Sequence, residues 1–195
     1  MKSRKVRWKT PLQSEHVHAL RLLLNNQGKH KELCLLNIGI DTALRSSDLL
    51  RIKVRDLKDS HSNWLKELEV NQKKTGHKVT VYLSENSIES LNNYAQHMED
   101  YQFLFPGRFD GHMTGRAYWN IVERWIKMLG LPTECYATHS IRKTLPAEIY
   151  RQTGNLEYCR QVLGHKDQRT TQLYLGIDKE KIREVHEKIG RASCR

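Results

Sequence analysis

The sequence has few of the features that stabilise secreted, metal-dependent or membrane proteins. Its four cysteines lie far apart among 195 residues and form no Cys-x-x-Cys pair, so reduced thiols are expected. Histidines and cysteines do not cluster at the spacing of zinc ligands, which argues against a metal site. No apolar run is long enough to cross a bilayer, and none follows the basic start as in a signal peptide. These absences indicate a cytoplasmic protein.

Acidic residues are scarce relative to basic ones. The chain has 33 lysines and arginines against 22 aspartates and glutamates, a formal net charge of +11. Such a charge favours a polyanionic partner, most commonly nucleic acid for a cytosolic protein, although a merely basic surface explains it equally well. The segment before Gln13 contains basic residues and no acid. It is either a disordered tail or an arm along phosphates, with candidate contacts at Arg4, Lys5 and Arg7.

Hydrophobic periodicity predicts a mainly helical domain. Apolar residues recur at helical spacing in Val17–Leu24 and in Leu33–Leu44, with Gly28 between them as a stop. The one clear strand signal is a hairpin formed by residues 65–70 and 79–83 around a glycine-bearing turn. A short helix is expected after Ser46 or Ser47, and longer ones over residues 84–98, 114–129, 139–152, 155–163 and 179–188. The predicted fold class is therefore mainly α with a small antiparallel β-sheet.

Three short motifs in the last third of the chain carry side chains able to do chemistry. The first contains His139 and Arg142, which project from one face of a helix because they are three residues apart. The second, Leu163-Gly164-His165, ends a helix and lets the histidine leave the helical path. Tyr174 follows His165 by nine residues, which leaves room for a turn and the first part of another helix. Each motif alone is common, whereas their order and spacing together are specific.

Together these motifs resemble the catalytic domain of the tyrosine recombinases, the phage integrase family. The family's first-arginine motif is similar to Thr42–Leu50, in which Arg45 is followed three residues later by Asp48. The family's catalytic lysine lies on a β-turn, which resembles Lys74-Thr75-Gly76 in the predicted hairpin. The resemblance runs from about residue 12 to residue 177. It implies a site-specific recombinase that cleaves and rejoins DNA through a covalent 3′-phosphotyrosine intermediate, without metal, ATP or cofactor.

The resemblance also assigns roles that suit the chemistry of these residues. Arg45 and Arg142 would stabilise the charge of the transition state, since a guanidinium offers a rigid fork of donors to two phosphate oxygens. His139 and His165 would donate to the phosphate or accept the tyrosine proton, because imidazole titrates near neutrality. Tyr174 would be the nucleophile and would store the bond energy in a phosphotyrosyl ester.

The hairpin residues and Asp48 have further roles under the same resemblance. Lys74 would protonate the departing 5′-oxygen. Lys73 is its rival for this role, and Lys74 is preferred because it directly precedes Thr75 and Gly76. Lys73 and His77 are also candidate DNA contacts. Asp48 is expected to be structural, either as a helix cap or as a partner that orients an arginine.

Two features depart from the family's usual pattern. Pro146 lies inside the helix that carries Arg142 and removes the hydrogen bond to the carbonyl of that arginine, so we expect either a kink or a new helix starting at Pro146. The catalytic pattern also begins almost at once, without the usual N-terminal clamping domain. The chain is therefore either a small recombinase or an excised fragment. Its expected parts are a basic arm or linker (1–11), a catalytic domain (12–178) and a C-terminal helix and tail that could contact another protomer (179–195).

The resemblance implies double-stranded DNA as the partner, bound by a homotetramer on two DNA sites, with an accessory DNA-bending protein as an option and no membrane association. It also implies a protein of the cytoplasm and nucleoid, encoded by a bacterium or a phage. Three alternatives stay open: a type IB topoisomerase that relaxes DNA as a monomer, a non-catalytic DNA-binding relative, and a plain basic helical protein whose matches are accidental. The intact set of catalytic positions argues against the second.

Overall fold

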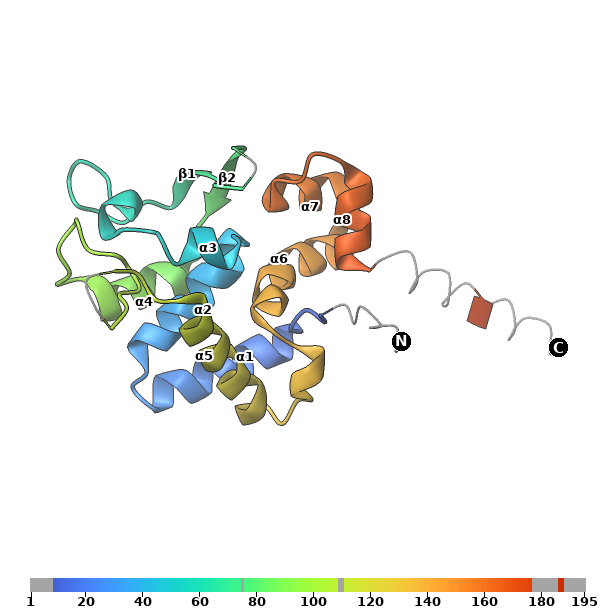
Figure 1. The fold of residues 1–195 in the computed structure, drawn as a ribbon, viewed down its shortest axis with the longest axis horizontal. Helices are drawn as coiled ribbons and strands as arrows, with labels where there is room; N and C mark the ends of the chain where they lie inside the picture. The colour runs from blue at the N-terminus through green and yellow to red at the C-terminus, as the bar shows by residue number, and fades with distance from the viewer. Residues whose placement is uncertain (1–8, 75, 109–110, 177–185, 188–195) are drawn as a thin grey trace, which may run out of the picture.

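The computed structural model describes residues 9–74, 76–108, 111–176 and 186–187. These residues form eight α-helices and one two-stranded antiparallel sheet (Figure 1), which confirms the predicted fold class. Two 3₁₀ turns, η1 (Val54–Leu57) and η2 (Thr133–Cys135), lie in the connections. The regular elements are α1 (Ser14–Asn26), α2 (His30–Thr42), α3 (Ser46–Leu49), β1 (Glu67–Asn71), β2 (Lys78–Tyr82), α4 (Glu85–Ala95), α5 (Gly115–Met128), α6 (Thr138–Thr153), α7 (Leu156–Leu163) and α8 (Gln168–Leu175).

Helix α2 is the centre of the hydrophobic core. All residues from Cys34 to Ile40 are buried, so this helix is enclosed on all sides and not along the single stripe that was predicted. Helices α1, α4 and α6 pack around it. The helix also ends earlier than its apolar pattern suggests, because Ala43 adopts a φ of +45° and places Leu44 beyond the helix. This turn leads the chain directly to the first predicted arginine.

The predicted hairpin is confirmed, with each strand displaced slightly from its predicted bounds. Leu68 pairs with Val81 and Val70 with Val79 in an antiparallel register. Leu68, Val79 and Val81 are buried in the core, while the alternate residues of β2 are exposed, as the two-residue period of a strand requires. The hairpin also packs against α7 through β2 (Figure 1), so that its turn extends beside the end of that helix.

Helix α6 connects the core around α2 with the last two helices, α7 and α8. It packs against α2 and α5 and also against α7 and α8 (Figure 1). The helix runs from Thr138 to Thr153 with Pro146 inside it, so the predicted alternative of a new helix starting at Pro146 is wrong. The proline still removes the helical hydrogen bond to the carbonyl of Arg142. The packing of α6 on both sides keeps it a single helix despite this loss.

The ends of the helices follow the predicted stop and start signals. Asn155 caps α7 by accepting a hydrogen bond from the amide of Glu157 at 2.9 Å, and Thr114 caps α5 in the same way. Gly154 and Gly164 end α6 and α7 in the left-handed conformation. The helix predicted over 179–188 lies outside the described residues except for residues 186–187, which are helical.

Candidate active site

Five of the six predicted catalytic residues lie in one cluster. Arg45 precedes α3, and His139 and Arg142 lie on α6. His165 directly follows the glycine that ends α7, and Tyr174 lies in the last turn of α8. The charges of both arginines act on both histidines and on the phenol of Tyr174. The cluster forms because α6, α7 and α8 pack in succession and α6 also contacts α2, whose end leads to α3.

Arg142 is held by backbone carbonyls. Its side chain is only 5% exposed; Nε donates to the carbonyl of Ala43 at 2.8 Å and Nη2 to the carbonyl of Leu163 at 2.9 Å. Burial lowers the pKa of Arg142 to about 10, so the guanidinium remains charged at neutral pH. Nη1 is its one terminal nitrogen without a hydrogen-bond partner among the described residues. The side chain is thus fixed in place and still has a donor for a substrate.

Gln72 links the first arginine to the same carbonyl. Its Oε1 accepts a hydrogen bond from Nη1 of Arg45, and its Nε2 donates to the carbonyl of Leu163 at 3.0 Å. Gln72 is 1% exposed, so it belongs to the interior, although it directly precedes the exposed turn of the hairpin. The end of α7 therefore positions both arginines, one directly and the other through this glutamine.

Gly164 allows the hairpin to approach the end of α7. Its φ is +62°, and a Cβ at this position would lie 2.6 Å from both Nε2 of Gln72 and Cγ1 of Val79. Only glycine meets both the conformational and the steric requirement. The chain then turns inward at His165, which is 8% exposed and whose Nδ1 lies 3.1 Å from Oγ1 of Thr171. The predicted departure of this histidine from the helical path is confirmed.

Both histidines are shifted towards the neutral form. Burial, together with the charges of Arg142 and Arg45, lowers the pKa of His165 to about 4. The pKa of His139 is also lowered, first by partial loss of hydration and then by the charges of Arg142 and Lys143. Before an anion is bound, both rings are therefore neutral imidazoles near pH 7. A neutral imidazole can donate from one nitrogen and accept a proton at the other.

The ring of Tyr174 is enclosed by the cluster. It makes an edge contact with the ring of His165, with centroids 5.4 Å apart, and Cζ of Arg142 lies 5.6 Å from its centroid. Burial raises the pKa of the phenol, an effect that the charges of Arg142 and Arg45 oppose. The Tyr174 hydroxyl is buried and has no hydrogen-bond partner among the described residues. A buried hydroxyl without a partner is costly in free energy. The Tyr174 hydroxyl can therefore form a hydrogen bond with a substrate oxygen or with a proton acceptor.

The predicted hairpin contacts are exposed and lie outside this cluster. Lys73, Lys74 and His77 are all solvent-exposed residues at the turn between β1 and β2. Within the described part of the chain, no contact joins Lys74 to the other five predicted catalytic residues, so its role stays a prediction. Outside the described residues lie the three arm candidates, Arg4, Lys5 and Arg7.

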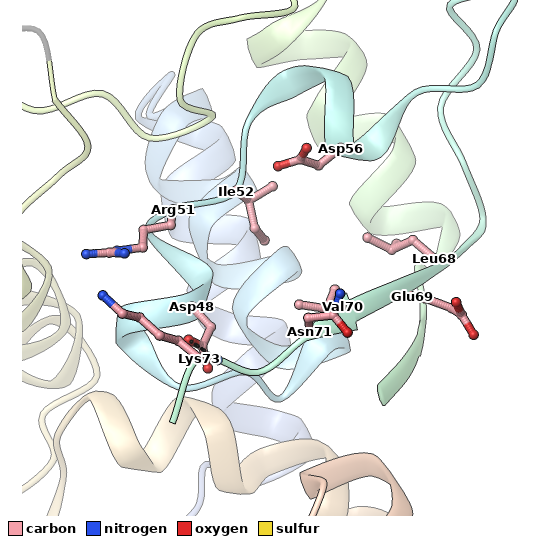
Figure 2. A pocket seen from close by; sticks show the side chains of 9 residues that line it. All are labelled: Asp48, Arg51, Ile52, Asp56, Leu68, Glu69, Val70, Asn71 and Lys73. Atoms are coloured by element: carbon pink, nitrogen blue, oxygen red, sulfur yellow. Dashed lines mark hydrogen bonds between the residues drawn. The ribbon is translucent and has the colours of Figure 1, made fainter. Parts of the chain in front are cut away.

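Asp48 supports the base of the hairpin turn. Its Oδ1 accepts a hydrogen bond from the amide of Lys73 at 3.3 Å. Among the described residues Asp48 neither caps a helix nor hydrogen-bonds an arginine, although its charge acts on Arg142. Asp48 also borders a cavity of about 580 Å³ between α3 and β1, where the side chains of Arg51 and Lys73 extend to the same side (Figure 2). The cavity is lined by Asp48, Arg51, Ile52, Asp56, Leu68, Glu69, Val70, Asn71 and Lys73.

Three buried residues of the site were not singled out from the sequence. Thr171 was open to prediction, because it lies three residues before Tyr174 and so on the same face of a helix. Lys143, beside Arg142 on α6, is 3% exposed, and no pattern distinguishes it from an exposed lysine. Gln72 has no sequence signal either, since it stands at the end of a strand and before two lysines.

Within the described residues, no group of three histidine, cysteine, aspartate or glutamate side chains is placed to hold a metal ion. The three described cysteines, Cys34, Cys135 and Cys159, are free thiols. The described part of the chain also has no helix with the length and apolarity needed to span a membrane.

The fold is that of a tyrosine recombinase catalytic domain. It matches the solved structure of the XerA recombinase with a TM-score of 0.72 at 19% identity, over 93% of this chain and 65% of that one. It matches the XerH site-specific recombinase bound to its difH substrate with a TM-score of 0.71 at 20% identity, over 92% of this chain and 54% of that one. The predicted architecture is thereby confirmed.

Sequence comparison identifies the family. The model of the phage integrase family matches residues 10–181, and the chain belongs to that family. A Bacillus subtilis protein named "Probable integrase/recombinase YoeC" is 26% identical over 182 residues, which cover 92% of this chain and 96% of that protein. The tyrosine recombinase XerD of Yersinia pestis is 24% identical over 165 residues, 80% of this chain but 53% of XerD. The chain thus spans nearly all of one relative and about half of the other.

These matches confirm the enzyme class predicted from the sequence, a site-specific recombinase of the tyrosine type. They give no support to a type IB topoisomerase or to a plain basic helical protein. The family does not by itself assign a role to any side chain.

Proposed function

We propose that this chain cleaves and rejoins strands of duplex DNA, with Tyr174 as the nucleophile of a 3′-phosphotyrosine intermediate. The observation that carries the proposal is an enclosed tyrosine beside two buried or half-buried arginines and two neutral histidines. DNA is the expected partner because a phosphodiester matches paired guanidiniums and the net charge of +11 attracts polyanions. The solved structures of XerH with difH and of a lambda integrase dimer on a core site support DNA as the substrate.

In the first step, the Tyr174 oxygen attacks the phosphorus and the bond from phosphorus to the 5′-oxygen breaks. A 3′-phosphotyrosyl ester remains, and the phenol proton passes to a neutral histidine. His165 is the candidate for this role because its ring contacts the ring of Tyr174. The negative charge of bound phosphate raises the pKa of His165 and makes it a stronger base than in the free protein. Lys74 donates a proton to the departing 5′-oxygen. A new 5′-hydroxyl reverses the step, so no ATP is consumed.

Arg45 and Arg142 stabilise the charge that develops on the phosphoryl oxygens. Their hydrogen bonds within the protein go to an amide and to backbone carbonyls, which are neutral acceptors. Their positive charges are therefore not cancelled by a bound carboxylate and are available to the phosphate. Because the side chains are already held in place, little reorganisation is required in the transition state.

The organisation of the whole protein is part of the proposal. A basic arm or linker over 1–11 would follow the DNA backbone, residues 12–178 would form the catalytic domain, and 179–195 would contact a neighbouring protomer. The family match over residues 10–181 supports a catalytic domain that takes up most of the chain. The active assembly would be a homotetramer on two DNA sites, aided in some reactions by a DNA-bending protein, in the cytoplasm and nucleoid of a bacterium. The bacterial relatives support this location.

The nucleophile is tested with nicked duplexes of randomised sequence, in which the short cleaved product diffuses away and traps the covalent state. The wild-type chain is expected to form a protein–DNA adduct that survives denaturation and gel electrophoresis. Tyr174→Phe lacks the attacking oxygen and is expected to form none. Tyr158→Phe is the matched control, since Tyr158 lies on α7 and is 51% exposed; it is expected to react as the wild type does.

Two results would contradict the proposal. An adduct formed by Tyr174→Phe at the wild-type rate would assign the nucleophile to another residue. A wild-type chain that binds the duplexes but forms no adduct with any of them would favour the non-catalytic DNA-binding alternative.

A further inference from the structure

Lys143 is buried against the proposed nucleophile. The residue is 3% exposed and follows Arg142 on α6. Its Nζ lies 4.7 Å from the centroid of the Tyr174 ring, within the range of a cation–π contact. Burial also lowers the pKa of Lys143 to about 8. A lysine is rarely placed in such a position unless its ammonium is bound.

The same ammonium holds the segment through which the chain enters the domain. Nζ of Lys143 donates to the carbonyl of Lys9 at 3.0 Å. The neighbouring residues of this entry segment, Lys9 to Leu12, are also fixed: the amide of Thr10 donates to the carbonyl of Cys135 at 2.9 Å. The amide of Leu12 donates to Oγ1 of Thr144 at 3.3 Å. The entry segment and the ring of Tyr174 therefore share one side chain as a contact.

We propose that Lys143 is a positioning residue for Tyr174, and that it couples the position of this ring to the entry segment at Lys9. The inference rests on the proposed function, in which Tyr174 is the nucleophile. An ammonium bound to the Lys9 carbonyl at one side and to the ring at the other transmits a displacement of the entry segment to the phenol. Any part of the protein that pulls on residues before Lys9 would then influence the orientation of the attacking oxygen.

The catalytic arm of the test measures the single-turnover rate of adduct formation on the nicked duplexes. Lys143→Met keeps the length of the side chain but loses its charge and its donors, and is expected to slow the reaction about tenfold through misplacement of the nucleophile. Lys143→Arg retains both and is expected to restore most of the rate. Lys127→Met is the control for loss of one positive charge, because Lys127 is an exposed residue of α5 that pairs with Glu123. Its rate is expected to match the wild type.

The structural arm observes the ring directly and needs no DNA. Tyr174 is replaced by 3-fluorotyrosine in the full chain, and its ¹⁹F resonance is recorded. Lys143→Met is expected to shift the resonance, and Lys127→Met to leave it unchanged. Thr10→Pro removes the backbone amide hydrogen that donates to the Cys135 carbonyl. Residue 10 lies outside the helices, so the proline interrupts no helix. If Lys143 couples the entry segment to the ring of Tyr174, Thr10→Pro shifts the resonance in the wild-type background and not in the Lys143→Met background.

The outcomes separate this inference from the proposed function. A ¹⁹F resonance that is the same with and without Lys143 overturns the positioning role, whatever the adduct assay gives. Equal effects of Thr10→Pro in both backgrounds overturn the coupling to the entry segment. If instead Tyr174→Phe still forms the adduct, the proposed nucleophile is wrong while the ¹⁹F result continues to test the contact itself.

Discussion

The Leu163 carbonyl oxygen connects both arginines of the site. It accepts hydrogen bonds from Arg142 and from Gln72, and Gln72 accepts one from Arg45. Carbonyls at the end of a helix carry partial negative charge, which suits a guanidinium without neutralising it. Asp48, the nearest acid in the motif, is directed to the amide of Lys73 instead. Two cations are thereby oriented by neutral acceptors, without a hydrogen bond to a carboxylate among the described residues.

Lys74 is expected to act as the general acid for the leaving 5′-oxygen. Lys74→Ala should therefore reduce adduct formation strongly on ordinary DNA, by about 10² or more. A duplex with sulfur in place of the bridging 5′-oxygen has a leaving group that departs without a proton. On that duplex Lys74→Ala should cleave nearly as fast as the wild type, as measured by single-turnover kinetics.

Lys73→Ala is the matched control for this prediction. Its side chain is exposed on the same turn, so it should weaken DNA binding without any selective rescue by sulfur. If the sulfur-containing duplex restored cleavage by Lys73→Ala but not by Lys74→Ala, Lys73 would be the general acid in place of Lys74.

His165 should make stability depend on pH. Its pKa is about 4 in the folded protein, whereas an ordinary histidine has a pKa of 6.5, so the unfolded state binds more protons between these values. The free energy of unfolding then rises as pH increases from about 4 to 6.5, by roughly 2–3 kcal/mol from this residue. His165→Gln removes the titration and should lack that part of the rise, as measured by urea denaturation at each pH. Equal pH profiles for the two chains would show that the ring is not held neutral by burial.

The contact between α7 and the hairpin should depend on Gly164. Gly164→Ala must accommodate both a φ of +62° and a Cβ that meets Gln72 and Val79 at 2.6 Å. Gly154→Ala is the control for conformation alone, since its φ is +64° and no heavy atom lies within 4 Å of the added Cβ. We expect Gly154→Ala to cost about 1 kcal/mol, and Gly164→Ala roughly 1–3 kcal/mol more.

Urea denaturation measures both costs, and the adduct assay measures the consequence for the site. Because the Leu163 carbonyl and Gln72 position the arginines, Gly164→Ala should also slow adduct formation, whereas Gly154→Ala should not. Equal destabilisation by the two substitutions would mean that the hairpin moves away from the added Cβ of residue 164 without a cost in free energy.

Elements were predictable where a local signal decides them. The hairpin follows from its alternation and its glycine-bearing turn, and α7 from Asn155 at one end and Gly164 at the other. The continuity of α6 through Pro146 was not predictable, because the packing of this helix on both sides outweighs the loss of one hydrogen bond. The burial of α2 on all sides likewise depends on which helices surround it, and this is a property of the tertiary structure.

At the scale of the whole molecule, the candidate site divides in the same manner. The residues that converge around Tyr174 were predictable from the sequence, because they stand in short motifs of characteristic order and spacing. The side chains that hold them were not: Gln72 hydrogen-bonds the end of α7, 91 residues later in the chain, and Lys143 hydrogen-bonds Lys9, 134 residues earlier. A buried polar residue has no local signature when its partner is distant in sequence. The enzyme class was therefore predictable and the scaffold of its site was not.

In the proposed reaction one oxygen, that of Tyr174, forms the covalent bond to DNA. The most direct measurement is to isolate the adduct trapped on the nicked duplexes, digest protein and DNA, and map the modified peptide by mass spectrometry. We expect a nucleotide linked through its 3′-phosphate to Tyr174. A nucleotide found on another residue, or attached through its 5′-phosphate, would contradict it.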